Sequence, residues 1–364
     1  MRVFQFHYCY PAYFDYLAKR HADVSDMSFE RRLALLLEHR YNAVHILEPI
    51  YRRDPELGVT VANDPLLQGK WAAEHGMTSR DLTVILLAQI EEHRAEVVYS
   101  LDPIHWDSAF VRRLPGCVKK TICWRAAPIL NADLSAYDLR VCNFPNFLNK
   151  WTAQGMRSAY FSPSHDPRMR DFANEERRPI DICFVGGYSD LHVRRNRLLE
   201  VLASLADKHR VVLALTHPQH RPLINLPLLR RIPSPFPYLP ENLRRIAVPP
   251  VFGLEMYQLF GQAKVVFNGF GEIAEEYRGN MRSFEAMGCG ACMLSEAGIY
   301  PENMVAGVHF ETFRDEAEMK CKLQTSLATP AQARNMGRLA AGNLEKHYSK
   351  PAQWKAFQDL VASI

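Results

Sequence analysis

The segment from residue 280 to residue 295 combines a carboxylate with the glycines of a turn. Its letters, NMRSFEAMGCGACMLS, predict a helix that leads through Gly288 and Gly290 into a short apolar strand. A helix N-terminus presents unbonded backbone N–H groups to a phosphate. One turn further on, Glu285 is placed to accept hydrogen bonds from two sugar hydroxyls. The segment suits a nucleotide sugar, although a structural helix that ends at a glycine explains it equally well.

A second turn with two glycines follows a short apolar run, in the letters FVGGYSDLHVRR. Backbone N–H groups near Gly186 and Gly187 can approach an anion closely. Arg195 adds a cation to the same end, and His192 either donates to phosphate or helps to cap the following helix. Alone, this turn is explained by a tight strand-to-helix connection. Together with the Glu285 segment, it predicts a diphosphate site.

Three further residues complete the predicted donor site. Arg282 lies three residues before Glu285 and shares its helix face, so it forms either a structural ion pair or a phosphate contact. Asn280 is a candidate ligand and equally a good N-cap residue. Asn268 ends the apolar strand predicted from Val265. Ligands of doubly wound sheets bind at the carboxyl ends of strands, where these residues fall.

Polar residues also follow predicted strands in the first half of the chain. Asp102 and His105 come after a strand that ends near residue 101, and either is a candidate general base. Capping of the next helix is the commoner role for an Asp in this position. A further set is predicted to contact an acceptor because its members follow other strands. The set is His7, Tyr10, Trp124 and Arg125.

Motifs of several other enzyme classes are absent from the sequence. There is no GxxxxGK[ST], GxGxxG, GxSxG or HExxH pattern. There is also no Asp-x-Asp, which many glycosyltransferases use to hold a divalent metal, so we predict that no metal is required. Stabilisation of a leaving group then falls to arginines, backbone N–H groups and helix dipoles.

The eight cysteines predict reduced thiols and no metal centre. Most lie inside apolar runs, as buried thiols do. Cys289 and Cys292 form a CxxC pair, but a zinc site needs two more ligands at matching spacing and none stands out. Packing at the turn is the favoured explanation for this pair.

Composition indicates an ordinary globular protein of two domains. The chain has 364 residues, more than a single core usually serves, with 48% hydrophobic and 23% charged residues. A net charge of +4 permits an anionic ligand without calling for nucleic acid. No export signal or membrane-spanning run is recognised, which predicts a cytoplasmic protein; peripheral attachment at the inner membrane face stays open.

The alternation of short apolar strands with longer helices predicts an α/β fold with two Rossmann-like, doubly wound domains. Most strands are read from clean apolar runs, including residues 43–47, and the proline-rich segment 218–250 is expected to be mostly extended or loop. The predicted divisions are an N-terminal acceptor-binding domain (1–165), a linker (166–180), a C-terminal donor-binding domain (181–345) and a final helix (346–364) that packs back on the N-terminal domain.

These motifs together resemble the donor domain of group 1 glycosyltransferases with the GT-B architecture. The shared pattern comprises the Phe-Val-Gly-Gly turn, the strand ending at Asn268 and the RSFEAMGCG block that begins at Arg282. More narrowly, the chain resembles the CgeB-like (spore maturation protein B-like) branch, to which the block NDPLLQGKWAAE at residues 63–74 is similar.

The resemblance implies a nucleotide sugar bound by the C-terminal domain, an acceptor bound by the N-terminal domain, and catalysis in the cleft of the GT-B plan. It implies that Glu285 binds ribose and that the glycine turn lies near the diphosphate. The sequence departs from the family at one point. The broader group has a Glu-x7-Glu motif whose first Glu falls at Tyr277 here, with Glu275 and Glu276 out of register.

We therefore predict a metal-independent glycosyltransferase with no tightly bound cofactor. Its co-substrate is a UDP-, GDP- or dTDP-sugar, and its acceptor is a surface polysaccharide, a lipid-linked glycan or a protein. Nucleic acid is not an expected partner. Two alternatives stay open: a sugar-nucleotide epimerase on the same fold, and a non-catalytic protein that binds nucleotide sugars or acts as a scaffold. Inverting and retaining stereochemistry both remain open because of Tyr277.

Overall fold

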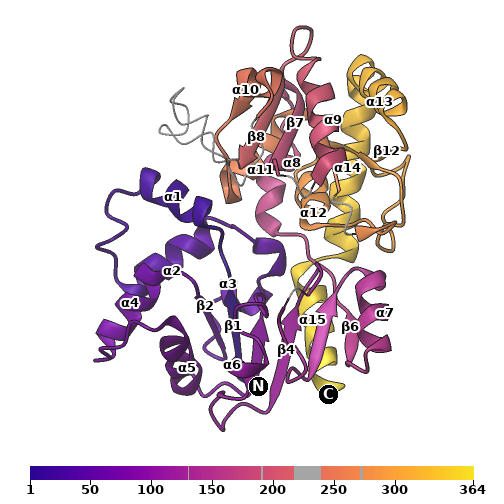
Figure 1. Ribbon diagram of the computed structural model, residues 1–364. Coiled ribbons are helices and arrows are strands. Elements are labelled where there is room, and N and C mark those ends of the chain that lie inside the picture. Colours follow the sequence, from indigo (N-terminus) through magenta and orange to yellow (C-terminus); the bar gives the residue numbers. More distant parts are fainter. Residues whose placement is uncertain (130, 190–191, 217–238, 271–273) are drawn as a thin grey trace. The chain divides into compact units, whose positions relative to one another are not determined.

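The computed structural model describes residues 1–129, 131–189, 192–216, 239–270 and 274–364. The chain divides into two compact units (Figure 1). Unit 1 comprises residues 1–164 together with 350–364, and unit 2 comprises residues 165–349. Each unit is built around one six-stranded sheet, and all the strand pairs in both sheets are parallel.

The sheet of unit 1 has the order β2-β1-β3-β4-β5-β6. The chain moves outward from β1 in both directions, so the order reverses between β1 and β3. In doubly wound sheets, ligands bind at the carboxyl ends of strands beside such a switch point. The strands are β1 (Val3–His7), β2 (Leu57–Val61), β3 (Val97–Ser100), β4 (Lys120–Trp124), β5 (Leu139–Cys142) and β6 (Ser158–Tyr160).

Helices flank this sheet, and side-chain oxygens begin several of them. Asp64, Asp81 and Asp107 each accept hydrogen bonds from backbone N–H groups in the first turn, as N-cap residues do. The helices are α1 (Pro11–Arg20), α2 (Phe29–Glu38), η1 (Ala43–His45), α3 (Glu48–Tyr51), α4 (Pro65–Glu74), α5 (Leu82–Glu92), α6 (Ser108–Val111), α7 (Pro145–Ala153) and α15 (Lys350–Ala362).

The sheet of unit 2 has the order β12-β11-β10-β7-β8-β9, with its switch point between β7 and β10. This is the strand order of a Rossmann fold. The strands are β7 (Ile180–Gly187), β8 (Val211–Thr216), β9 (Ala247–Val248), β10 (Ala263–Asn268), β11 (Cys292–Glu296) and β12 (Glu311–Phe313).

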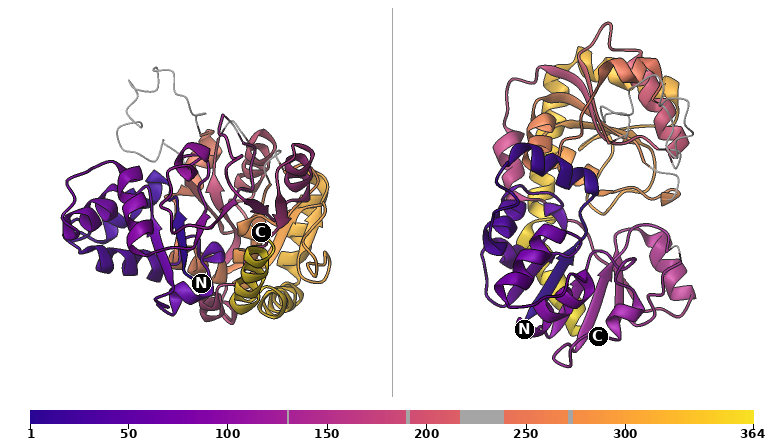
Figure 2. Two further views of the ribbon diagram at one scale, coloured as in Figure 1. Left: turned by 90° about the horizontal axis from the view of Figure 1, so that it is seen from below. Right: turned by 60° about the vertical axis from the view of Figure 1, so that its left-hand side comes forward.

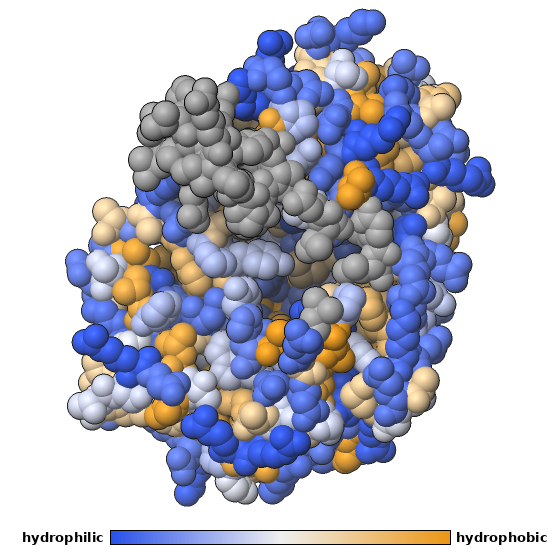
Figure 3. All heavy atoms as spheres, in the orientation of Figure 1, coloured by the Kyte–Doolittle hydropathy of each residue, from blue (hydrophilic) through white to orange (hydrophobic). Residues whose placement is uncertain are grey.

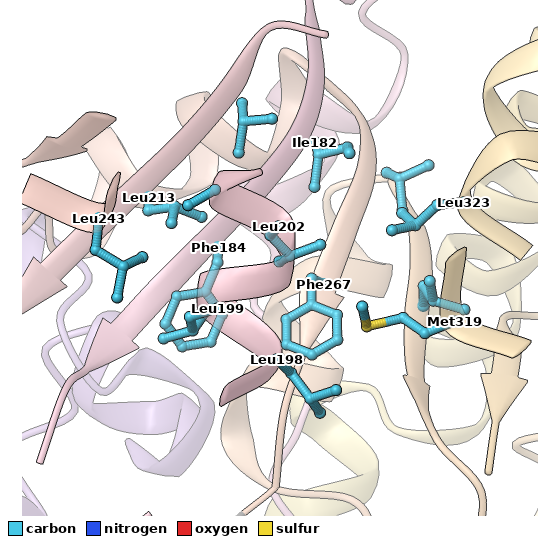
Figure 4. Packing of buried hydrophobic residues seen from close by; sticks show 14 of the residues in the cluster. Ile182, Phe184, Leu198, Leu199, Leu202, Leu213, Leu243, Phe267, Met319 and Leu323 are labelled. Carbon is cyan, nitrogen blue, oxygen red and sulfur yellow. The ribbon is translucent and has the colours of Figure 1, made fainter. Parts of the chain in front are cut away.

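Apolar side chains from the helices of unit 2 pack on this sheet. Leu198 and Leu202 of α9, with Met319 of α13, meet Phe184 and Phe267 of the strands (Figure 4). All of them are at most 5% exposed, which is typical of a continuous core. The helices are η2 (Pro167–Met169), α8 (Arg170–Ala173), α9 (Val193–Ala203), α10 (Glu241–Ile246), α11 (Gly253–Gly261), α12 (Met281–Gly288), α13 (Glu316–Ala328) and α14 (Pro330–His347).

One predicted strand is corrected by the structure. Residues 43–47 were expected to be a strand, but Ala43–His45 form the 3₁₀ helix η1, which the left-handed Asn42 (φ 57°) precedes. The apolar run is buried at a helix end rather than in a sheet. Of the segment 218–250, residues 218–238 lie outside the described residues, and the part after Pro240 contains helix α10. Pro240 stands at its N-cap position and leaves the helix interior free of proline.

The predicted linker at residues 166–180 folds into unit 2 instead. It contains η2, α8 and the first residue of β7. The buried guanidinium of Arg178 donates to four backbone oxygens, at 3.0 to 3.3 Å, and so fastens the segment to the core. The polar composition that suggested a linker therefore includes a side chain that binds buried carbonyl groups. The acceptors are the oxygens of Ala173, Phe260, Ala263 and Cys289.

The final helix α15 belongs to unit 1 and lies beside its strands, as its yellow ribbon shows in Figures 1 and 2. Its first residue, Lys350, is 2% exposed, and its Nζ donates to the carbonyl oxygens of Ala43 and, at 2.5 Å, Ile46. The ring of Tyr51 lies 5.7 Å from the same ammonium group. A buried cation therefore fixes the end of the chain to η1 and α3. No helix in the described part of the chain is long and apolar enough to cross a bilayer.

Candidate active site

The carboxyl edge of unit 1 carries a hydrogen-bonded carboxylate and imidazole. Asp102 Oδ2 lies 2.7 Å from His105 Nδ1, and Asp102 also accepts from the backbone N–H of His105. Asp102 is 7% exposed, whereas the His105 side chain is 60% exposed. A carboxylate on Nδ1 fixes the ring and its tautomer, so that Nε2 is the basic nitrogen. Such a pair is suited to accept a proton from a hydroxyl group.

The position of this pair follows from the sheet topology. Asp102 comes two residues after the end of β3, and its backbone N–H donates to the hydroxyl of Ser100 at 3.2 Å. The His105 ring stacks on Tyr8, with centroids 5.0 Å apart and planes 3° from parallel. Tyr8 directly follows β1, so the pair and its stacking partner lie at the β1/β3 switch point.

Two of the four predicted acceptor residues, Tyr10 and Arg125, are not fully buried. Tyr10 is 58% exposed and lies against Tyr8, at a centroid distance of 6.2 Å. The half-buried Arg125 donates to the oxygens of Ala127 and Pro128, and so shapes the loop that follows β4. Burial lowers the pKa of Arg125, and the charge of Asp102 acts in the opposite direction.

The other two predicted acceptor residues lie in the interior of unit 1. His7 is 3% exposed, and burial, helped by the charge of Lys350, lowers the pKa of its ring to about 3. Trp124 is 8% exposed and packs on His45 and Phe161. Strand residues alternate between the two faces, and both faces of this sheet are covered, so a strand-end position did not guarantee exposure. Both side chains support the edge from within, and their assignment as acceptor contacts stays a prediction.

Sequence reasoning missed Tyr8, although a signal was present. His7 is the last residue of β1, and Tyr8 is the first residue beyond it. Ligands of doubly wound sheets bind outside the carboxyl ends of the strands, and Tyr8 lies just beyond that end of β1.

At the switch point of unit 2, Arg195 joins the ends of two strands. Its guanidinium donates to the oxygen of Gly187, at the end of β7, at 2.7 Å. Its aliphatic stem packs on Gly269, just after β10, where an added Cβ would lie 2.7 Å from Arg195 Cγ. Among the described residues, a Cβ at Gly187 would meet only the oxygen of Thr216, at 3.9 Å, whereas Gly186 is packed over the Phe184 ring. Gly187 is thus open to the described part of its surroundings, and Gly186 serves packing.

Helix α12 begins near the carboxyl end of β10. Asn280 caps it by accepting from the backbone N–H of Ser283, and the amide of Asn268 donates to Asn280 Oδ1 at 3.1 Å and to Ser283 Oγ at 3.0 Å. The two asparagines therefore lock the N-terminus of α12 to the carboxyl end of β10. His192 stands at the N-cap position of α9, where its side chain makes no capping hydrogen bond.

The predicted ribose ligand is paired inside unit 2. Glu285 is 2% exposed, and its Oε2 accepts from the guanidinium of Arg282 at 2.6 Å. Burial raises the pKa of Glu285, Arg282 opposes this change, and Asp166 adds to it. Arg282 also lies over the ring of Phe260, at 5.6 Å. The ion-pair alternative for Arg282 and Glu285 is the arrangement in this structure.

A second buried carboxylate at this edge was not foreseen. Glu296, the last residue of β11, accepts from the backbone N–H of Phe270 at 2.8 Å and from Arg194 at 2.8 Å. Glu296 is 3% exposed, and its carboxylate neutralises the charge of Arg194 within the unit. Among the described residues, no group of three or more His, Cys, Asp or Glu side chains is arranged to hold a metal ion. All eight cysteines are free thiols.

Residues 194–359 match the model of a protein family described as glycosyl transferase-like. The structure is similar to that of Anabaena Alr3699/HepE in complex with UDP and glucose, with 12% identity over the whole of both chains and a TM-score of 0.59. It is also similar to a glycosyltransferase from Rickettsia africae ESF-5, with 9% identity over 99% of this chain and 97% of that chain and a TM-score of 0.56. A search of curated proteins finds no match.

These likenesses show that the chain has the GT-B fold. The match of residues 194–359 to a glycosyl transferase-like family supports the predicted class, an enzyme that transfers a glycosyl group. The CgeB-like branch, the nucleobase, the acceptor and the roles of single residues stay predictions.

Proposed function

We propose that the protein is an inverting, metal-independent glycosyltransferase that uses a UDP-sugar and belongs to the CgeB-like branch. His105 removes the proton of an acceptor hydroxyl through Nε2 while the oxygen attacks the anomeric carbon. The bond from that carbon to the phosphate oxygen breaks, and the nucleoside diphosphate leaves. The hydrogen bond of 2.7 Å between Asp102 and the exposed His105 is the observation that carries this proposal.

The choice of an inverting mechanism rests on the acid–base pair and on Tyr277. Inversion needs a base for the acceptor, and Asp102 stabilises the imidazolium that forms when His105 takes the proton. Tyr277 occupies the position of the first Glu in the Glu-x7-Glu pattern, which contacts the sugar in retaining enzymes of the wider group.

The donor assignment rests on the β7/β10 switch point of unit 2. Arg195, held at Gly187 and Gly269, supplies a cation there. The N-terminus of α12 supplies backbone N–H groups, and we assign Arg282 to the diphosphate and Glu285 to the ribose. UDP is favoured as the nucleotide because Alr3699/HepE, which shares the fold, is described in complex with it.

The remaining parts of the proposal concern the acceptor and the setting of the enzyme. A surface polysaccharide, a lipid-linked glycan and a protein are all hydroxyl-bearing acceptors that His105 could serve. The cytoplasm, with attachment to the inner membrane face as an option, is the proposed location.

A nucleotide screen followed by product analysis tests the proposal. We expect UDP to bind more tightly than GDP or dTDP in calorimetry, with no change on addition of EDTA. With UDP-α-glucose as donor, the anomeric proton of the product should show a β-linkage in NMR. An α-linked product would overturn the inverting mechanism, and loss of UDP binding in EDTA would overturn metal independence. UDP binding without transfer or hydrolysis of any sugar would favour the non-catalytic alternative.

A further inference from the structure

Unit 1 contains a cavity of about 550 Å³ at the opposite end of its strands from Asp102 and His105. It is lined by the first residues of β1 and β2, including Phe4 and Gly58, and by α2 and the end of α5. Figure 1 shows α2, α4 and α5 on the same side of unit 1 as β2, which is an edge strand of the sheet. The volume lies within the usual range for small-molecule sites.

One polar side chain in the wall of this cavity differs from the other buried glutamines, whose amide nitrogens all donate a hydrogen bond. Gln89 of α5 is 4% exposed, yet neither its amide nitrogen nor its amide oxygen has a hydrogen-bond partner among the described residues. The other buried glutamines donate through their amides: Gln5 to the oxygen of His45, Gln68 to Thr60 and Gln353 to Val44. A buried amide without partners is costly, so such groups are nearly always satisfied.

The remaining lining favours an uncharged, flat ligand. Aromatic and aliphatic side chains, among them Phe4, Leu37 and Trp71, form the apolar part of the wall. Three arginines and four carboxylates also line the cavity, so their charges nearly cancel. His93 adds no charge, because its Nε2 accepts from the N–H of Gly58 at 3.1 Å and burial lowers its pKa.

We propose that this cavity binds a small, uncharged aromatic carboxamide or lactam. The ligand's amide would pair with the amide of Gln89, which offers one donor side and one acceptor side in a single plane. Its ring would pack against the aromatic part of the wall. This site is independent of the glycosyl-transfer residues, which lie at the carboxyl edge.

Calorimetry with benzamide as the probe, on the full chain, tests the proposal. Benzoate and benzylamine have the same ring and carry a charge, so they should bind at least tenfold more weakly. Gln89→Leu should weaken benzamide binding at least tenfold while the melting temperature without ligand stays the same or rises, because an unsatisfied amide is replaced by an apolar group of similar size. Absence of saturable benzamide binding, or unchanged affinity in Gln89→Leu, would overturn the proposal.

Two further variants guard against a trivial effect. Ala34→Phe, which places a ring in the cavity and keeps Gln89, should also exclude benzamide. Gln358→Leu makes the same chemical change on the exposed face of α15 and should leave benzamide affinity as in the wild type. A fall in the melting temperature of Gln89→Leu, with Gln358→Leu unaffected, would show that the amide already has a partner, and would contradict the proposed role.

Discussion

The two switch points of the molecule treat their charged groups in opposite ways. At the β1/β3 edge of unit 1, His105 is 60% exposed and is oriented by a buried carboxylate. At the β7/β10 edge of unit 2, the carboxylates of Glu285 and Glu296 are buried and already paired with Arg282 and Arg194. The first edge presents a reactive group, whereas the second holds its charges in internal pairs.

This difference agrees with the separate roles that we propose for the two edges, proton removal in unit 1 and diphosphate binding in unit 2. A general base must reach a proton on its substrate, so part of it has to be accessible before the substrate binds. A diphosphate site can instead keep its arginines paired, because an incoming anion of higher charge competes with the internal carboxylates for them. The face shown in Figure 3 is mostly hydrophilic, with scattered hydrophobic side chains.

Removal of the base should produce the largest effect. His105→Ala is expected to lower kcat for sugar transfer by about 10²–10⁴-fold, the usual contribution of a general base. Asp102→Asn should fall in the same range, since it disturbs the tautomer and orientation of His105. Steady-state kinetics with a UDP-sugar, alongside calorimetric UDP affinity, provide the measurement.

The control for this prediction is the affinity itself. Because the pair lies in unit 1 and the donor site is assigned to unit 2, UDP affinity should stay within about twofold of the wild type. Wild-type kcat in His105→Ala would show that the exposed pair is not the base, and the contrast between the two edges would lose its catalytic meaning.

A second comparison concerns two of the buried cations, one chosen from each unit. Arg178 serves four carbonyl oxygens in unit 2, and Lys350 serves those of Ala43 and Ile46 in unit 1. Arg178→Met should reduce the free energy of unfolding by about 3 kcal/mol or more, because several buried acceptors lose their donor. Lys350→Met should cost less, about 1–2 kcal/mol, since it removes the donor of two carbonyl oxygens rather than four.

Urea unfolding of the two methionine variants measures both effects, and the order matters more than the size. If Lys350→Met were the more damaging change, the hydrogen bonds of Lys350 would contribute more to the free energy of unfolding than those of Arg178. That result would contradict the expectation from the larger set of acceptors around Arg178.

The internal pairing of Glu285 leads to a smaller effect, on binding. Glu285→Ala should weaken UDP binding by about 10–100-fold, the loss expected for hydrogen bonds to a charged acceptor. Glu311→Ala is a matched control, because Glu311 pairs with Lys322 at 2.7 Å at the start of β12, away from the carboxyl edge. Equal UDP affinities in the wild type and Glu285→Ala would remove the ribose assignment and leave Glu285 a structural partner of Arg282.

The sequence predicted the α/β fold and the strand ends well because buried parallel strands are short, continuous apolar runs. It could not separate Tyr8 from His7, since exposure at a strand end depends on which helices cover it. The block at residues 63–74 shows the same limit. Asn63 exchanges two hydrogen bonds with the backbone of Cys9, and the buried Asp64 pairs with Arg32 at 2.7 Å. Long-range partners such as these leave no local pattern.

The pairing of distant charges was equally hidden. Arg282 and Glu285 are neighbours on one helix, so their contact was anticipated as an alternative. Glu296 reaches Arg194 across 102 residues of sequence (296 − 194), and only the parallel order of the sheet brings them together.

Acid should weaken unit 1 through two neutral histidines. Burial, first, and the charge of Lys350, second, lower the pKa values of His7 and His45 to about 3. In the unfolded chain a histidine has a pKa of about 6.5. Between about pH 6 and pH 4 the unfolded state therefore binds more protons, and the free energy of unfolding falls as the pH falls, by about 1.4 kcal/mol per pH unit for each histidine.

Glutamine carries no titrating proton, so His45→Gln should make that pH dependence shallower by about 1.4 kcal/mol per pH unit. Urea unfolding at pH 6, 5 and 4 gives the slope, whatever the variant costs at neutral pH. His309, which is more exposed in unit 2, provides the control, and His309→Gln should change the slope much less. An unchanged slope in His45→Gln would mean that this ring takes up a proton in the folded state, and that the interior of unit 1 tolerates a second cation beside Lys350.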